Sequence, residues 1–297
     1  MSPAKYDSLD KVITDHFGNN VLIEGKRGVS GGDINAAYLL TLSDGNKLFL
    51  KENSVKNADF FRAETEGLKA IRNTGCIRVP ETIANGVYGN TAFLLMEYAG
   101  AGARKSAFWE DFANALADMH EADASSYTPG GKYGFTDDNY IGAGCQKNSV
   151  RSEWVLFFRD CRLLPQFERA KPYLSPDDCR KMDSLLQNLD KFLPEPEHPS
   201  LLHGDLWGGN YITGPDGNAW LIDPAVYVGH AEADIAMTEL FGGFSAAFYR
   251  AYEERGLIQP GYGGRRDLYN LYHMLNHLNL FGGSYLGAVR RIISSYT

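Results

Sequence analysis

The sequence predicts an α+β protein with two lobes: a small N-terminal lobe built on an antiparallel sheet, and a larger, mainly helical C-terminal lobe. Two strand-like runs joined by an Asp-Gly turn occupy residues 36–53, whereas from residue 108 onward apolar residues recur mainly three and four positions apart. A glycine-rich segment at residues 97–102 suits a connection between the two patterns. We therefore place the N-lobe at residues 1–97 and the C-lobe at residues 98–297 of one domain.

The N-lobe pattern consists of a helix, a hairpin, a second helix and a strand. Apolar residues at helical spacing predict a helix over residues 9–17. Strands are expected at residues 36–42 and 47–53, because an Asp-Gly pair between apolar runs is a strong hairpin signal. A second helix is expected over residues 58–72, and a strand over residues 92–98. Before the hairpin, we interpret residues 28–35, GVSGGDIN, as a glycine-containing loop.

The C-lobe pattern is helical apart from one hairpin. Only two short strands, YIT and AWLID, are expected there, and a Gly-Pro-Asp-Gly turn joins them. This hairpin should bring Asp223, at its end, close to the loop that precedes it. The three clearest helical segments are residues 108–122, 152–167 and 177–193.

The composition and charge of the chain limit the classes of partner and substrate that it can have. The chain has 297 residues, of which 44% are hydrophobic, and a net charge of -8, so no overall field draws it to nucleic acid or to anionic lipid. Its four cysteines stand far apart, and the sequence contains neither a secretory signal nor a run long enough to span a membrane. We expect reduced cysteines, a cytoplasmic location and a small-molecule or protein substrate. Oligomeric state is not indicated.

The stretch HGDLWGGN, residues 203–210, carries the strongest chemical signal. Asp205, Leu206 and Asn210 have the spacing of the protein-kinase catalytic loop, although the Arg of that loop is missing. Phosphoryl transfer needs a carboxylate that accepts the proton of the attacking hydroxyl, and oxygen ligands for Mg²⁺ beside it. Asp205 suits the first task, while Asn210 and the strand-end Asp223 suit the second.

The N-lobe supplies matching parts for ATP. Lys51 lies on the second hairpin strand, where a lysine could hold phosphates, and Glu64 lies on the next helix, where it could pair with that lysine. Gly31 and Gly32 belong to a loop that could cover phosphates with backbone N–H groups. Each piece alone is also typical of ordinary turns and solvated charges. Their order along the chain favours a kinase-like phosphotransferase.

The chain resembles the fructosamine kinase, or ketosamine-3-kinase, family. The resemblance covers nearly the whole sequence, with matching stretches that include DNYIG and RRDLYNLYHMLNHLNLFGG. It is most specific in HGDLWGGN together with DPA and ELFGGF. It implies a protein-kinase-like fold related to aminoglycoside and choline phosphotransferases. It also implies phosphorylation, by ATP with Mg²⁺, of the sugar 3-hydroxyl of free or protein-bound ketosamines. The unstable product would then release the amine, which is deglycation.

The resemblance also assigns roles to residues of this chain. Asp205 would accept the proton, Asn210 and Asp223 would bind Mg²⁺, and Lys51 with Glu64 would form the phosphate-holding ion pair. We expect Trp207 to contact the substrate, because its ring could stack on a sugar or face a protonated amine, with packing of the loop as the alternative. The backbone that would bind adenine belongs to Met96, Glu97 and Tyr98. His277 and Asn276 are candidates to line the substrate pocket, with a helix-capping or core role as the alternative.

Other functions stay open at this point. The first is another small-molecule kinase of the same fold, acting on an aminoglycoside, choline or homoserine. The second is a catalytically silent, nucleotide-binding pseudokinase, which the intact set of predicted site residues disfavours. A protein kinase is disfavoured because no A-P-E sequence follows Asp223, and a zinc site because His198 and His203 lack the further ligands.

Overall fold

The computed structural model describes residues 3–29 and 34–297 of the chain. Contacts divide the chain into two units, the first formed by residues 1–106 and 212–223 and the second by residues 107–211 and 224–297. The chain thus returns to the first unit for one short segment. The division at residue 97 rests on the sequence and stays a prediction.

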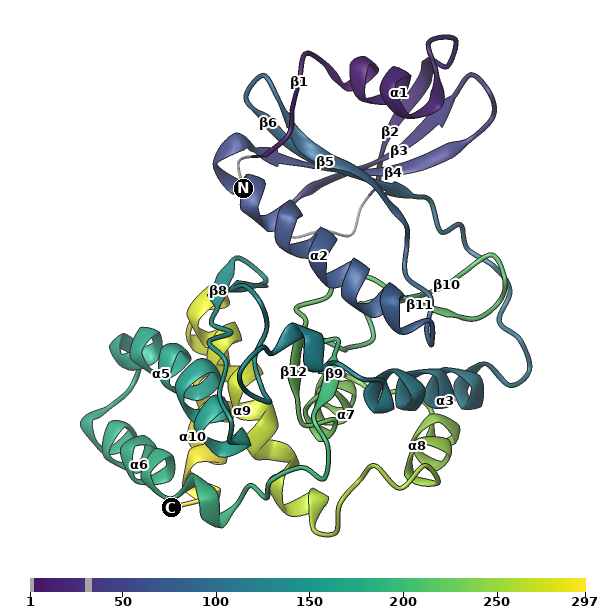
Figure 1. Cartoon of the computed structure of the whole chain (residues 1–297). Coiled ribbons are helices and arrows are strands. Elements are labelled where there is room, and N and C mark those ends of the chain that lie inside the picture. The colour runs from purple at the N-terminus through teal and green to yellow at the C-terminus, as the bar shows by residue number, and fades with distance from the viewer. Residues whose placement is uncertain (1–2, 30–33) are drawn as a thin grey trace. The chain divides into compact units, whose positions relative to one another are not determined.

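A six-stranded sheet forms the centre of the first unit (Figure 1). The strand order is β1-β5-β6-β4-β3-β2, and all neighbours are antiparallel except β1 and β5. The predicted hairpin is β3 and β4, with the expected bounds to within one residue. The strands are β1 (Lys5–Tyr6), β2 (Ile23–Val29), β3 (Ala36–Leu42), β4 (Lys47–Ser54), β5 (Thr82–Tyr88) and β6 (Thr91–Glu97).

The helix α1 (Leu9–Phe17) covers one face of this sheet. It begins where the Ser8 side chain accepts a hydrogen bond from Lys11 N, 3.2 Å away, as a helix N-cap does. Its buried residues Val12 and Ile13 belong to one apolar cluster with Leu48 and Leu50 of β4. The helix predicted over residues 9–17 is therefore confirmed.

The helix α2 (Ala58–Thr74) covers the opposite face. Side chains alternate along a strand, so Lys51 of β4 points away from the cluster that contains Leu50. Lys51 contacts Glu64 of α2 instead. The helix ends at Gly75, whose φ of 70° places it in the left-handed conformation that glycine adopts without strain. A 3₁₀ turn, η1 (Val55–Asn57), connects β4 to α2.

Three strands of this sheet, β1, β2 and β5, were not predicted. Residues 28 and 29, assigned above to a glycine-containing loop, belong to β2, so that part of the prediction was wrong. β2 lies at the sheet edge and is mostly exposed, which removes the apolar alternation that identifies a strand. β5 contains Asn85 and Gly86, which are poor strand formers. A Cβ on Gly86 would lie 2.5 Å from Ala4 O, so the close approach of β1 requires glycine there.

The segment that returns to the first unit is the predicted hairpin. It is held to that unit by backbone hydrogen bonds from Gly102 N to Thr213 O, 3.1 Å, and from Leu221 N to Arg78 O, 2.9 Å. These bonds attach Asp223, two residues after Leu221, to the unit that carries Lys51. The strands are β10 (Tyr211–Thr213) and β11 (Ala219–Leu221).

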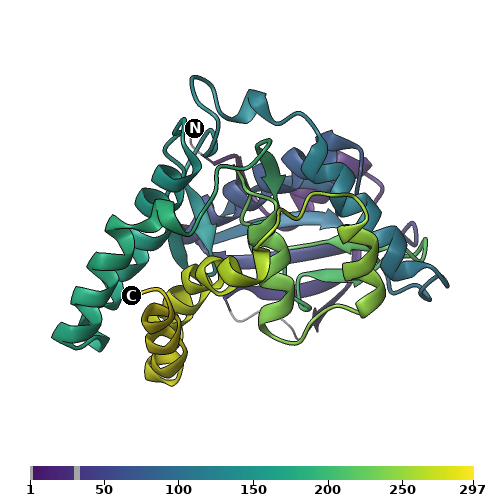
Figure 2. The same cartoon turned by 90° about the horizontal axis from the view of Figure 1, so that it is seen from below.

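Helices dominate the second unit. The central helix α9 packs against α5, α7 and α10, and α3 packs against α8 (Figure 2). The described helices are α3 (Phe108–Glu121), α4 (Trp154–Phe157), α5 (Leu164–Ala170), α6 (Pro176–Gln187), α7 (Glu232–Leu240), α8 (Ala246–Glu253), α9 (Tyr262–Phe281) and α10 (Leu286–Ser295). The 3₁₀ turns are η2 (Ser125–Tyr127), η4 (Lys171–Tyr173), η5 (Leu189–Lys191) and η6 (Gly283–Tyr285). The predicted α+β, kinase-like fold class is confirmed by these elements and by the comparisons reported below.

The helix predicted over residues 152–167 is not uniform. A π-helical turn, η3 (Phe158–Leu163), separates α4 from α5. Pro165 lies in the first turn of α5 and cannot donate the hydrogen bond that an α-helix would require of it. The π turn places Arg162 in the interior, where its side chain is fully buried.

The expectation of only two strands in the second part of the chain was wrong. Four further strands form two pairs, and each strand has three residues, which is too short for a recognisable alternation. They are β7 (Asn139–Ile141) with β8 (Gly144–Gln146), and β9 (Ser200–Leu202) with β12 (Tyr227–Gly229).

Candidate active site

A buried carboxylate on α7 holds the start of the loop that carries Asp205. Asp234 accepts hydrogen bonds from His203 N at 2.7 Å and from Gly204 N at 2.9 Å, one to each oxygen. Gly204 has φ 81°, and a Cβ there would lie 2.0 Å from Ala225 O, so only glycine fits. The loop therefore leaves β9 in one fixed direction.

Asp234 is in turn held by two other helices. His120 of α3 contacts its Oδ2 through Nε2 at 3.2 Å, and Tyr252 of α8 lies 2.6 Å from the other ring nitrogen of His120. Burial alone would raise the pKa of Asp234, but the hydrogen bond and charge of His120, the charge of His203 and the Gly204 amide hold the pKa below its usual value. The carboxylate thus stays ionised and ties α3, α7 and α8 to the loop.

Asp205 and Asn210 are in direct contact, as their spacing suggested. Asn210 Nδ2 donates to Asp205 O at 2.8 Å and to Asp205 Oδ2 at 3.1 Å. The Asp205 amide lies 3.3 Å from His203 Nδ1, so this histidine helps to hold the loop. Asn210 is 6% exposed, whereas the Asp205 side chain is 22% exposed and can meet a ligand.

A second histidine lies beside Asp205, and the sequence had given it no role. His273 of α9 is buried, and its Nδ1 lies 3.9 Å from Asp205 Oδ1. Burial lowers the pKa of His273 to about 3, so the ring is neutral at physiological pH. Asp205 is therefore not neutralised by this neighbour. The feature of the sequence that could have identified His273 is its position one helical turn before His277, which was a predicted substrate residue.

Lys51, Glu64 and Asp223 meet in the first unit. Lys51 Nζ lies 2.7 Å from Glu64 Oε1 and also forms an ion pair with Asp223. Burial alone would lower the pKa of Lys51, but the two carboxylates raise it above its usual value. Burial raises the pKa of Glu64 to about 7, although Lys51 opposes the shift. The Lys51 ammonium thus pairs with two carboxylates. The predicted contact between Lys51 and Glu64 is present.

Asp223 has an unusual backbone. Its φ of 54° is the only positive φ of a non-glycine residue among those described. Such a conformation costs about 1–3 kcal/mol and is found mostly where function requires it. The side chain is 44% exposed, so it can take a ligand besides Lys51. Asn210, the other predicted Mg²⁺ ligand, belongs to the second unit.

The predicted adenine-binding segment is the end of β6. Met96 and Glu97 are its last residues, and Tyr98 follows. Glu97 N donates to Glu81 O at 2.8 Å, and Tyr98 O accepts from Gly100 N at 3.0 Å. These two backbone groups are thus already engaged. The predicted phosphate-covering glycines, Gly31 and Gly32, lie outside the described residues.

Trp207 is exposed but its ring is fixed. The indole lies against Gly209, where a Cβ would come within 2.3 Å of Trp207 Cη2. Its other neighbour is Phe241, at 6.4 Å between ring centroids and 79° between planes. The side chain is nevertheless 40% exposed. A ring held in this way presents an apolar surface two residues from Asp205.

The two remaining substrate candidates differ. Asn276 is 3% exposed, and its Oδ1 accepts a hydrogen bond from Gln166 Nε2 at 3.0 Å, which is a contact between α9 and α5. This arrangement favours the core role of Asn276. His277 is partly exposed and touches Phe241, with 4.9 Å between ring centroids. Burial lowers the pKa of His277, which favours the neutral ring.

Polar residues of the β7–β8 hairpin hold the backbone that follows Asp223, and the sequence analysis missed them. Gln146 Nε2 donates to Ala225 O at 2.9 Å, and Asn139 Nδ2 donates to Val226 O at 2.7 Å. Tyr272 of α9 donates to Gln146 Oε1 at 2.6 Å. The signal in the sequence was DNYIG, a stretch of the family resemblance to which no role had been given.

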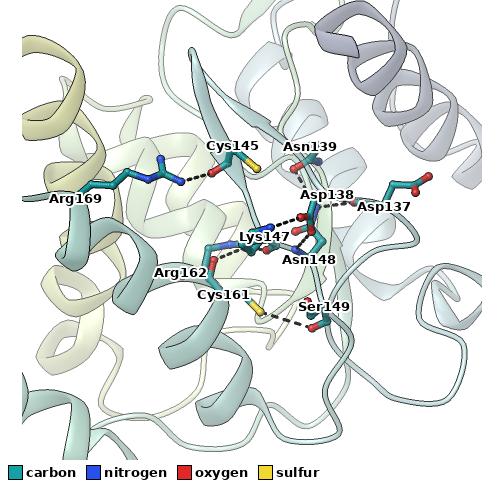
Figure 3. Close-up of polar contacts among 10 residues, drawn as sticks. All are labelled: Asp137, Asp138, Asn139, Cys145, Lys147, Asn148, Ser149, Cys161, Arg162 and Arg169. Atoms are coloured by element: carbon teal, nitrogen blue, oxygen red, sulfur yellow. Dashed lines mark hydrogen bonds and ion pairs between the residues drawn. The ribbon is translucent and has the colours of Figure 1, made fainter. Parts of the chain in front are cut away.

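The same hairpin is fixed from below by the π turn (Figure 3). Arg162 donates to Asn148 Oδ1 at 2.8 Å, and Asn148 donates to Asn139 Oδ1 at 2.9 Å. The guanidinium lies 3.8 Å from the ring centre of Tyr227, so its charge faces an aromatic ring. Figure 3 also shows Lys147 paired with Asp138, each one residue outside a strand of the hairpin. The buried arginine therefore supports the segment next to Asp223 indirectly.

No group of three His, Cys, Asp or Glu residues in the described chain could hold a metal ion by itself. Mg²⁺ is commonly bound by one or two protein oxygens together with phosphates, so a strand-end carboxylate such as Asp223 suits it. All four cysteines are free thiols. Among the residues that the structure describes, no helix is long and apolar enough to cross a membrane.

Comparison with known proteins gives a consistent result. The family model for fructosamine kinase matches residues 5–297. A probable ketoamine kinase of Synechocystis sp. is 39% identical over 96% of this chain and 94% of its own length. A chloroplastic protein-ribulosamine 3-kinase of Oryza sativa subsp. indica is 36% identical over 94% of this chain and 80% of its own length.

Solved structures agree. A structure from Thermobifida fusca, described as a candidate fructosamine-3-kinase, superposes with a TM-score of 0.83 at 31% identity, covering 98% of this chain and 99% of that one. A macrolide 2'-phosphotransferase superposes with a TM-score of 0.59 at 15% identity over 96% of this chain and 95% of that one, and it shows the fold alone.

Proposed function

Because the chain belongs to the fructosamine kinase family, we propose that it transfers the terminal phosphate of ATP to the 3-hydroxyl of ketosamines, the products of amine glycation. The catalytic loop carries this proposal. Its base candidate, Asp205, is partly exposed at the end of a backbone fixed by Asp234, and the exposed ring of Trp207 stands two residues away. A fixed carboxylate next to an apolar ring suits a sugar whose reacting hydroxyl lies two carbons from the carbon that carries the amine.

In this proposal Asp205 orients the attacking hydroxyl and accepts its proton. The hydrogen bond from Asn210 to Oδ2 fixes the carboxylate plane, and the buried, neutral His273 leaves its negative charge intact. A general base of this kind contributes about 10²- to 10⁴-fold to the rate. The Asn210 amide nitrogen faces Asp205, so the amide oxygen is the atom that could bind a cation.

Lys51 holds ATP phosphates, and Glu64 keeps the lysine in place. Asp223, which is more exposed than either, is the residue that would bind Mg²⁺. When bound, Mg²⁺ neutralises negative charge on the phosphates. Since Lys51 is shared by two carboxylates, withdrawal of Asp223 toward a cation would leave the Lys51–Glu64 pair as the phosphate-holding unit. The glycine loop with Gly31 and Gly32 would cover the phosphates.

Adenine binds at the end of β6 in this proposal. The Glu97 amide already donates to Glu81 O, so the adenine must use other backbone groups of Met96 to Tyr98. The product, a ketosamine 3-phosphate, is unstable and releases the amine, which makes the biological role deglycation. We place the activity in the cytoplasm, on free or protein-bound ketosamines.

A substrate screen that follows ADP release tests this function. Fructosyl-lysine, ribulosyl-lysine and erythrulosyl-lysine are compared with an aminoglycoside, choline and homoserine, each with Mg²⁺ and ATP. We expect turnover of at least one ketosamine and a kcat/KM for it that exceeds those of the other alcohols at least tenfold. Phosphorylation of an aminoglycoside without turnover of any ketosamine would refute the proposal.

A further inference from the structure

Five aromatic rings form a continuous row on the second unit, and this row begins next to Asp205. Trp207 contacts Phe241, Phe241 contacts His277, and His277 contacts both Phe281 and Tyr285. The centroid distances are 6.4, 4.9, 5.5 and 5.1 Å, all within the range of favourable ring pairs. We call these five side chains the aromatic row.

Three of the five side chains in the aromatic row are large apolar groups that are exposed to solvent. Trp207 and Phe241 are each 40% exposed and Phe281 is 55% exposed. Large apolar side chains gathered on a surface mark a binding site more often than isolated ones do. Phe281 and His277 lie four residues apart on α9 and thus share one face of that helix. The row therefore offers one contiguous apolar surface.

The row also suits a particular chemistry. In a ketosamine, the amine is attached two carbons from the 3-hydroxyl, so a substrate whose hydroxyl meets Asp205 carries its amine toward neighbouring groups. Trp207, two residues along the loop, can face that protonated amine. The rings beyond Trp207 lead away from Asp205, and the neutral ring of His277 does not repel a cation. These rings are placed to contact the substituent on the amine nitrogen of the substrate.

We propose that Phe241, Phe281 and Tyr285 determine specificity for the amine side of the ketosamine, and favour amines with an apolar or aromatic substituent. This inference rests on the proposed function and adds to it the part of the substrate that is not phosphorylated. Phe281 and Tyr285 lie furthest along the row from Trp207, so they act on binding and not on the chemical step.

The test compares two substrates that differ only beyond the nitrogen: the adducts of methylamine and of phenethylamine with the ketose (fructose, ribulose or erythrulose) that gives the fastest turnover in the substrate screen. The variants are Phe281→Ala and Tyr285→Ala, with Tyr173→Ala as a control, because Tyr173 is similarly exposed, at 41%, on the separate turn η4. The wild-type kcat/KM should be about fivefold higher for the phenethyl adduct, the scale of one aromatic contact. Phe281→Ala should remove that advantage by raising KM with kcat unchanged.

The remaining outcomes separate the specificity role of these residues from the proposed kinase function. The methylamine adduct should keep its kcat/KM within about twofold in Phe281→Ala and Tyr285→Ala, and the control should behave like wild type. Equal wild-type kcat/KM for both adducts, or equal losses for both in the variants, would overturn the specificity role and leave the kinase function standing. If the wild-type protein phosphorylated neither adduct nor any other ketosamine, the proposed function would fall, and the specificity role with it.

Discussion

The two groups of predicted site residues are ordered by different physical means. In the second unit, the Asp205 loop is fixed by backbone amides that donate to one buried carboxylate, Asp234. In the first unit, Lys51, Glu64 and Asp223 are held by charges that attract one another. Hydrogen bonds to backbone fix a direction, whereas one cation shared by two anions leaves an excess of negative charge.

This difference separates positioning from binding. The Asp205 loop needs a fixed geometry, because a proton acceptor must stand within hydrogen-bond reach of the hydroxyl. In the group of Lys51, Glu64 and Asp223, the balance of charge must respond to a ligand, because bound phosphates and a bound cation would change it. We therefore expect substitutions in the loop network to affect turnover and stability, and substitutions in the Lys51 group to affect ATP binding and pH dependence.

The largest effect is expected for Asp205→Asn. Loss of the proton acceptor should lower kcat by at least about 10²-fold while ATP binding stays nearly intact. Asp183→Asn, on the exposed surface of α6, serves as the control. A kinetic assay beside isothermal titration measures both quantities. Near-normal turnover in Asp205→Asn would remove this residue from its proposed role.

The next effect concerns Asp234. Asp234→Asn replaces one oxygen with an amide that cannot accept the backbone N–H it faces, and it removes a buried charge. We expect a loss of about 3 kcal/mol in the free energy of unfolding, together with a kcat lowered more than tenfold. Tyr252→Phe removes only the outer hydrogen bond to His120 and should cost about 1 kcal/mol. Urea denaturation and steady-state kinetics check this, and an unchanged kcat in Asp234→Asn would contradict the positioning role.

A smaller effect is expected for Glu64→Gln. The pKa of Glu64 is raised from 4.5 to about 7 by burial, so the folded state binds a proton more tightly than the unfolded chain between these values. Its contribution to stability is therefore present below pH 4.5 and lost as pH rises toward 7, at a slope of up to about 1.4 kcal/mol per pH unit. Denaturation at pH 5, 6 and 7 should show this fall reduced in Glu64→Gln. Equal slopes in both proteins would show that Glu64 is ionised throughout.

His273 should have the opposite dependence. Burial lowers its pKa from 6.5 to about 3, so only the unfolded chain takes up the proton between these values. Its contribution to stability is present above pH 6.5 and lost as pH falls, again at up to about 1.4 kcal/mol per pH unit. His273→Gln should weaken the acid destabilisation between pH 6 and 4, measured by urea denaturation at each pH. A variant with the wild-type pH profile would contradict the buried, neutral state of His273.

The parts of the fold that the sequence predicted are those specified locally. Ser8 caps α1, the Asp-Gly turn joins β3 to β4, and Gly75 ends α2, each through a few neighbouring residues. β2 and β5 were missed because an exposed edge and a close backbone approach remove the local pattern. The three-residue strands of the second unit depend on pairing partners that are distant in sequence.

The candidate site divides in the same way. The Asp205–Asn210 contact follows from a spacing of five residues, and the Lys51–Glu64 contact from the order of strand and helix. Asp234 and His120 are 114 residues apart, and each looks like an ordinary helix residue in the sequence. Their role depends on which helices pack together, which no local pattern contains.

The position of the phosphate on the product tests the central claim most directly. Wild-type protein is incubated with Mg²⁺, ATP and the ketosamine that it turns over fastest in the substrate screen, and the product is examined at once by two-dimensional ¹H–³¹P NMR. We predict a phosphorus signal that correlates with the proton on carbon 3 of the sugar. A correlation with the proton of any other carbon would contradict a kinase in which Asp205 activates the 3-hydroxyl of a ketosamine.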